Sequence, residues 1–321
     1  MIISASRRTD IPTYYADWFM NRIREGYVCV RNPMNTHQVS RVALTSDVVD
    51  AIVFWTKNPV PMLPRLDELK AYMYYFQFTL NAYGRDVEAH VPSKNDVLVP
   101  AFRELAGRIG ADRVIWRYDP IFLTPKYTIT YHAQYFEELA RRLSGFTHRC
   151  VISFLDFYRN TESNMRGLSL MPLGEGEMRE LALRLAEIAH RYHMTIESCA
   201  EQVDLAPFGI AHGHCIDRAL LESLLGQRLD LRRDPSQREA CGCVASVDIG
   251  MYHTCLNGCV YCYANITEEA AAAHFRAHDP ASPLLYGSIG DQDRVTVRKV
   301  TSCRRCQLGL FDEGAPDGHG T

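Results

Sequence analysis

Short β-rich runs alternate with helical stretches along most of this chain, and no other feature of the sequence constrains its fold as strongly. Such alternation is typical of βα units, whose consecutive strands lie parallel in one sheet. We predict strands near residues 1–6, 27–32, 51–57, 72–80, 113–119, 150–157, 195–200 and 243–249. We predict helices near residues 12–25, 62–70, 96–109, 130–144, 175–192 and 215–226, with at most a short helix between 39 and 49. This order favours an α/β fold of the (β/α)8, TIM-type barrel class, whose usual size is about 250 residues.

The chain divides into three predicted parts. Residues 1–265 form a single barrel domain. Residues 266–308 form a C-terminal helix and an extension. The tail, 309–321, is rich in Gly, Asp and Pro, and we expect it to be disordered.

Composition narrows the possible classes of function. The 321 residues carry a formal net charge of −3. Non-specific binding to nucleic acid needs an excess of positive charge, so no nucleic-acid partner is expected. No apolar run reaches the roughly 18 residues that a membrane-spanning helix needs, so no membrane partner is expected either. The N-terminus begins as a strand rather than as a signal peptide. We therefore expect a cytoplasmic protein, a location that suits its 11 cysteines as reduced thiols.

Three of these cysteines form one loop near the C-terminus. Cys255, Cys259 and Cys262 follow the pattern C-x3-C-x2-C. Clustered cysteines in an intracellular protein are more often metal ligands than disulfides. Structural zinc sites usually pair two short elements, so a single loop with unequal gaps fits a [4Fe–4S] cluster better. Three thiolates would hold three irons and leave the fourth iron open to a small molecule.

This loop resembles the signature loop of the radical S-adenosylmethionine (SAM) enzymes. The resemblance implies that SAM binds the open iron, with Asn257 and Tyr261 of the loop among the cofactor-binding residues. It also implies cleavage of SAM to a 5′-deoxyadenosyl radical and an electron donor such as flavodoxin or ferredoxin. In that family the loop usually follows the first barrel strand, whereas here it follows the last predicted strand. We therefore expect a circularly permuted barrel, in which Ser4, Ser6 and Arg7 lie beside the loop and contact SAM.

Five stretches also resemble a bacterial family that carries only a domain-of-unknown-function label. They are Ile3–Asp10, Phe54–Pro59, Trp116–Pro120, Glu197–Glu201 and Cys241–Cys243 together with the cysteine loop. The family is distantly similar to radical SAM proteins of the spore-photoproduct-lyase kind. The resemblance supplies no reaction.

Unusual polar residues recur where the predicted strands end. Each could be a solvated charge, a structural ion pair or a helix cap. Buried charges are costly unless paired, so their recurrence at successive strand ends favours a polar barrel mouth that binds a small-molecule substrate. The candidate catalytic residues are Arg7, Asp10, Lys57, Arg117, Asp119, Asp156, Glu197 and Glu201.

A second set of cysteines is separate from the loop. Cys199, Cys215, Cys241 and Cys243 could hold a second [4Fe–4S] cluster or a zinc ion, or could be buried thiols. The first hypothesis for the whole chain is a radical SAM enzyme that abstracts hydrogen from an unknown polar substrate. The alternative is a zinc-stabilised binding protein without redox chemistry, in which Cys303 and Cys306 join Cys241 and Cys243 in a zinc ribbon.

Overall fold

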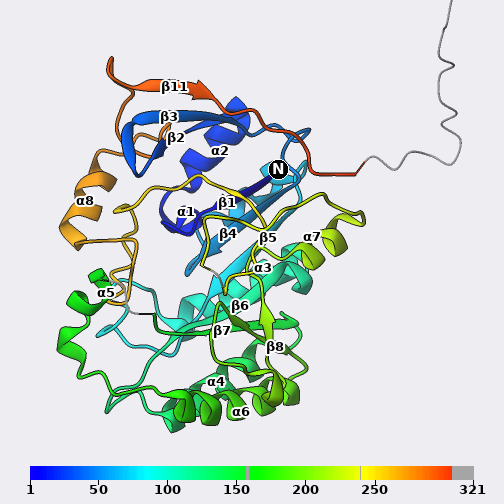
Figure 1. The fold of residues 1–321 in the computed structure, drawn as a ribbon, viewed down its shortest axis with the longest axis vertical. Coiled ribbons are helices and arrows are strands. Elements are labelled where there is room, and N and C mark those ends of the chain that lie inside the picture. The colour runs from blue at the N-terminus through cyan, green and yellow to red at the C-terminus, as the bar shows by residue number, and fades with distance from the viewer. Residues whose placement is uncertain (157–158, 239, 306–321) are drawn as a thin grey trace, which may run out of the picture.

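The computed structural model describes residues 1–156, 159–238 and 240–305. Eight strands form one parallel sheet in the order β10-β1-β4-β5-β6-β7-β8-β9, with helices around it (Figure 1). Its strands are β1 (Ile2–Ala5), β4 (Ala51–Thr56), β5 (Tyr74–Thr79), β6 (Val114–Ile121), β7 (Arg149–Phe154), β8 (Thr195–Cys199), β9 (Ala211–Gly213) and β10 (Val247–Asp248). The prediction of an α/β fold built on parallel strands is confirmed.

The helices connect these strands as the alternating sequence predicts. The α-helices are α1 (Ile11–Tyr14), α2 (Ala16–Glu25), α3 (Val99–Ile109), α4 (Ile129–Leu143), α5 (Arg159–Asn164), α6 (Glu175–Arg191), α7 (Arg218–Leu225) and α8 (Glu268–Arg276). The predicted helix near 62–70 is a 3₁₀ helix, η1 (Leu63–Leu69). Within the described residues, no helix is long and apolar enough to cross a membrane.

The predicted barrel is not confirmed, because the sheet is open between β9 and β10. These two edge strands are short, with three and two residues. The chain between them turns inward instead of closing the sheet. Ile216 and Leu221 pack against Val53, Tyr75 and other residues of the inner face, so this segment fills the space that barrel strands would enclose.

The predicted second barrel strand belongs to a different sheet. β2 (Tyr27–Asn32) pairs antiparallel with β3 (Asn35–Ala43), where at most a short helix was expected, and β11 (Arg294–Val297) joins β3. Because only two residues separate β2 from β3, the two strands can pair only as an antiparallel hairpin. β4 therefore pairs directly with β1.

At the other edge of the sheet, the strand that precedes the cysteine loop lies beside β1. β10, which precedes the cysteine loop, pairs in parallel with β1 through Ile3–Val247 and Ser4–Asp248. The predicted extension returns after α8 to the N-terminal part of the fold, where the Trp18 indole N–H donates to the Ser282 carbonyl at 2.9 Å. Residues 309–321 lie outside the described residues.

The side of the sheet that faces the long helices holds the main core. Phe54 and Phe76 stack with ring centroids 4.7 Å apart, and Trp116 stacks on Phe136 of α4 at 4.6 Å. Tyr75 and Ile115, one residue away on the same strands, face the inner side. The strands are thus covered on both faces, as is usual for a parallel sheet.

Replacing Phe76 with alanine should destabilise the fold by about 3–5 kcal/mol, because the side chain is fully buried and its removal leaves a cavity. Urea unfolding of the purified protein measures the change. The matched control is Leu183→Ala on α6, where the side chain is 44% exposed and the change should stay within about 0.5 kcal/mol. Equal losses in the two variants would contradict this description of the core.

Candidate functional site

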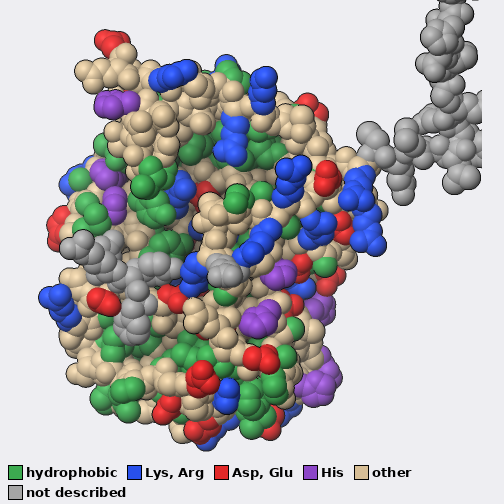
Figure 2. Space-filling view, in the orientation of Figure 1, with side chains coloured by type: hydrophobic (Ala, Val, Ile, Leu, Met, Phe, Trp, Pro, Cys, Tyr) green, Lys and Arg blue, Asp and Glu red, His purple; other side chains and the backbone are tan. Residues whose placement is uncertain are grey.

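A cavity of about 1260 Å³ opens where the parallel strands end at their carboxyl termini. Both predicted cysteine sets border it, together with residues from every strand between β1 and β8 and from the small sheet of β2, β3 and β11. Basic side chains lie around the hollow in the upper part of the face shown in Figure 2. The cavity is therefore where the sequence predicts a polar mouth, although the sheet around it is open.

The cysteine loop is held against the segment that follows β5. Cys259 forms a backbone bridge with Glu88, the Ala89 amide donates to the Gly258 carbonyl at 3.3 Å, and the Val260 amide donates to Val87 at 3.0 Å. Gly258 has a φ of +62°, and a Cβ there would lie 2.7 Å from the His90 ring. Only glycine fits this turn without strain.

Asp10 ties the same loop to the sheet. The Asn257 amide donates to its carboxylate at 3.2 Å, the Lys57 backbone N–H at 2.8 Å and the Thr56 hydroxyl at 2.8 Å. The carboxylate also accepts from the Thr13 amide as the cap of α1. Burial raises the pKa of Asp10. Because its carboxylate already accepts these hydrogen bonds, Asp10 has a positioning role. It holds the cysteine loop through Asn257.

The three loop cysteines are close enough to influence one another. Burial and the charge of Cys262 raise the pKa of Cys255 to about 12. Burial also raises the pKa of Cys259 well above its ordinary value, although the nearby Lys57 opposes this. Metal binding would displace the thiol protons, because only thiolates are strong ligands.

Glu88 is the centre of a buried ionic group, and no motif around it predicts this role. Its carboxylate pairs with Lys57 at 2.7 Å and Lys94 at 3.0 Å, and accepts from the Tyr261 hydroxyl at 2.5 Å. Burial alone would raise its pKa, but the two lysines and the hydrogen bonds lower it to about 2. Lys57 and Tyr261 are therefore fixed by the same carboxylate.

The side chains of Ser4 and Ser6 are hydrogen-bonded to Asp248 of β10. Their hydroxyls donate to its carboxylate at 2.9 and 2.7 Å, and the Arg7 amide donates to it at 2.8 Å. Ser4 also accepts from the Trp55 indole N–H at 3.2 Å. Asp248 was not predicted as a site residue. The signal in the sequence was a carboxylate on the last strand before the cysteine loop.

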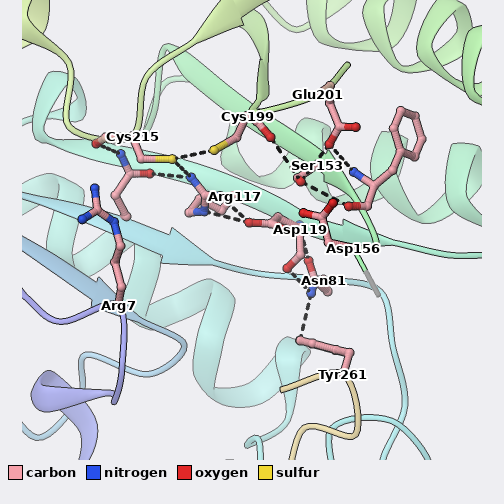
Figure 3. A network of polar contacts seen from close by, with 12 residues as sticks. Arg7, Asn81, Arg117, Asp119, Ser153, Asp156, Cys199, Glu201, Cys215 and Tyr261 are labelled. Carbon is pink, nitrogen blue, oxygen red and sulfur yellow. Dashed lines mark hydrogen bonds and ion pairs between the residues drawn. The ribbon is translucent and has the colours of Figure 1, made fainter. Parts of the chain in front are cut away.

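Arg117 and Asp119 lie on one face of β6, as the period of two predicts, and form an ion pair. The Arg117 Nη1 also donates to the Cys215 sulfur at 2.8 Å (Figure 3). Asn81 accepts from the Asp119 amide at 2.8 Å and bonds to the Tyr261 hydroxyl at 3.2 Å. This network reaches from one cysteine set toward the other.

The second cysteine set also comes together. The sulfurs of Cys199 and Cys215 are 2.9 Å apart, Cys215 also contacts Cys243, and Cys243 contacts Cys241. Cys306, the fourth member of the alternative zinc ribbon with Cys303, lies outside the described residues. The thiols of Cys241 and Cys243 nevertheless face Cys199 and Cys215.

The predicted acids after β7 and β8 separate into different environments. Asp156 borders the cavity and pairs with Arg238. Glu201 accepts from the Ser153 hydroxyl at 2.9 Å and the Phe154 amide at 2.8 Å, and burial raises its pKa to about 7. Neither Glu201 nor Glu197 is among the residues that line the cavity.

Glu197 belongs to an ion-pair cluster deeper in the fold. It pairs with Arg149 at 3.3 Å, and Arg149 also pairs at 2.9 Å with Asp217, the cap of α7. Arg149 begins β7, so this cluster lies away from the strand ends that form the cavity. Its position favours a structural role for Glu197.

Comparisons with known proteins identify the family. The family model described as "Domain of unknown function (DUF1848)" matches residues 2–264. No curated protein matches the chain. A solved structure of a candidate alpha-L-fucosidase from Bacteroides thetaiotaomicron aligns with 71% of this chain and 83% of its own at 11% identity, with a TM-score of 0.25. A similarity this low carries no argument about fold or activity.

Replacing Glu88 with glutamine should remove stability that depends on pH. The folded-state pKa of Glu88 is about 2, below the unfolded value of about 4.3, so its contribution is present above about pH 4.3 and is lost as the pH falls toward 2. Urea unfolding at several pH values should give wild type a larger free energy of unfolding than Glu88→Gln at pH 6. This difference should shrink as the pH falls. A difference that does not change with pH would contradict the buried ion pair.

Glu201→Gln should show the opposite dependence. The folded-state pKa is raised to about 7, so the favourable contribution of Glu201 is complete below about pH 4.3 and is lost as the pH rises through 7. The variant should gain stability relative to wild type between pH 5 and pH 8, measured in the same unfolding series. A relative loss over this range would show that Glu201 is held as a carboxylate.

Proposed function

We propose that this chain, which belongs to the DUF1848 family, is a radical SAM enzyme whose Cys255, Cys259 and Cys262 hold a [4Fe–4S] cluster. The observation that carries the proposal is the position of these cysteines. They belong to one short loop, and all three border a cavity of about 1260 Å³ at the carboxyl ends of parallel strands. Active sites of βα folds gather at these strand ends.

The residues of the loop fit such a cluster. All three cysteines lie within eight residues, and the Cys262 amide donates to the Cys259 carbonyl at 3.0 Å within a tight turn. When bound, the cluster would supply the electron that cleaves SAM into methionine and a 5′-deoxyadenosyl radical, which takes hydrogen from the substrate. A flavodoxin or ferredoxin is the class of partner that we expect to supply this electron.

The strand order supports a permuted form of the radical SAM fold. β10 leads into the cysteine loop and pairs with β1, so the loop and the end of β1 are neighbours although they lie far apart in the sequence. In this proposal Asp248 fixes Ser4 and Ser6, and Ser6 borders the cavity. Arg7, at the end of β1, borders the cavity beside Ser6.

The charges around the cavity favour an anionic small-molecule substrate. The acids Asp10, Asp119 and Asp248 are already bonded to protein groups. Arg294 and Arg298, on or just after β11, border the cavity with exposed side chains. A phosphate or carboxylate group on the substrate would meet these guanidinium groups, because arginine recognises such anions through two parallel hydrogen bonds.

Anaerobically reconstituted protein should be brown and should form 5′-deoxyadenosine from SAM when dithionite supplies electrons. Cys259→Ala should abolish this product, because one of three cluster ligands is lost. The matched control is Cys29→Ala, which removes a buried thiol from β2 outside the site and should leave product formation intact. Liquid chromatography with mass detection measures the product, and equal yields from Cys259→Ala and wild type would sink the assignment.

A further inference from the structure

Four cysteines from three separate places in the chain meet beside the cavity. Cys199 ends β8, Cys215 precedes α7, and Cys241 and Cys243 lie in the loop before β10. Their thiols contact one another in the order Cys199, Cys215, Cys243, Cys241, and all four are free cysteines that border the cavity. The fold thus brings together a complete set of four sulfur ligands.

The backbone around Cys241 and Cys243 is shaped to present both thiols. The thiols of Cys241 and Cys243 contact each other although Gly242 lies between the two residues. A Cβ on the intervening Gly242 would lie only 2.0 Å from the ring of His214, so that ring occupies the place of a side chain at position 242. The Ile216 amide donates to the Cys243 sulfur at 3.4 Å, and hydrogen bonds to sulfur tune iron–sulfur clusters.

Arg117, which is buried, and Arg7, which is half-buried, face this set of thiols. Arg117 donates to Cys215, and Arg7 lies near Cys215 and Cys243 and extends toward this region in Figure 3. The Nη2 of Arg7 is buried and has no hydrogen-bond partner among the residues that the structure describes. Buried charges are costly unless compensated, and neutral thiols do not compensate a guanidinium group. Thiolates around a metal centre would supply both negative charge and acceptor sulfurs.

We propose that Cys199, Cys215, Cys241 and Cys243 hold an iron–sulfur cluster, separate from the one assigned to the cysteine loop. Within the described part of the chain, no three Cys, His, Asp or Glu side chains converge as the ligands of one ion do. A cluster is larger than an ion and separates its thiolates more widely. The cavity of about 1260 Å³ next to the four thiols gives them room to move apart around it.

The test is a variant in which Cys255, Cys259 and Cys262 are all alanine. The full chain is reconstituted without oxygen and assayed for iron, acid-labile sulfide and the Mössbauer signal. Wild type should hold about eight irons and the triple variant about four, since each [4Fe–4S] cluster contributes four. Circular dichroism checks that the variant is folded.

Further substitutions in the triple variant assign the remaining iron. Adding Cys241→Ala should remove most of it, whereas adding Cys29→Ala, the matched control, should leave about four irons. The reciprocal variant, with Cys199, Cys215, Cys241 and Cys243 all changed to alanine, should keep about four irons on the loop.

The outcomes separate this proposal from the proposed function. A folded triple variant without iron overturns the second cluster and leaves the first assignment intact if wild type holds about four irons. Zinc in place of iron in the triple variant also overturns it. Iron that survives in the triple variant but is lost with Cys241→Ala supports it, whether or not wild type cleaves SAM.

Discussion

Lys57 joins the cysteine loop to the sheet, and the candidate site depends on this connection. Its backbone N–H donates to Asp10 at 2.8 Å and its ammonium group pairs with Glu88 at 2.7 Å. Asp10 holds Asn257 of the loop, and Glu88 holds Tyr261. An unpaired carboxylate at either buried position would be costly, so the end of β4 and the loop are constrained to form together.

The open sheet explains how the second cysteine set reaches the first. In a closed barrel, side chains from all strands fill the interior in layers. Here the segment around Ile216 and Leu221 enters from the open side and packs on the inner face of the sheet. This entry brings Cys215 to Tyr75 and Gln77, whose side chains both donate to its carbonyl, at 2.7 and 2.8 Å. The opening between β9 and β10 therefore lets this segment bring Cys215 to the wall of the cavity.

The sequence reveals local pattern and strand ends but not pairing between distant segments. Each of the eight predicted strand regions contains a strand, but alternation misses β3, β9 and β11. It places Arg117 and Asp119 on one face, because a strand has a period of two. It assigns Tyr27–Asn32 to the wrong sheet, since the pattern of a single strand does not specify its neighbour. Glu88 lies in an irregular segment, and only the tertiary fold brings it to Lys57 and Tyr261.

Trp55 fixes the positive charges between the two cysteine sets. The guanidinium groups of Arg7 and Arg117 lie 5.2 and 5.4 Å from the centre of its ring, and such contacts favour cations. The indole N–H donates to Ser4, whose hydroxyl donates to Asp248 on the strand that leads into the cysteine loop. The position of both arginines is thus set from the edge of the sheet, before any ligand binds. Cations that are already fixed in a cavity of low dielectric constant attract negative charge without having to reorganise. Such an arrangement would stabilise the thiolates of an iron–sulfur cluster and an anionic substrate.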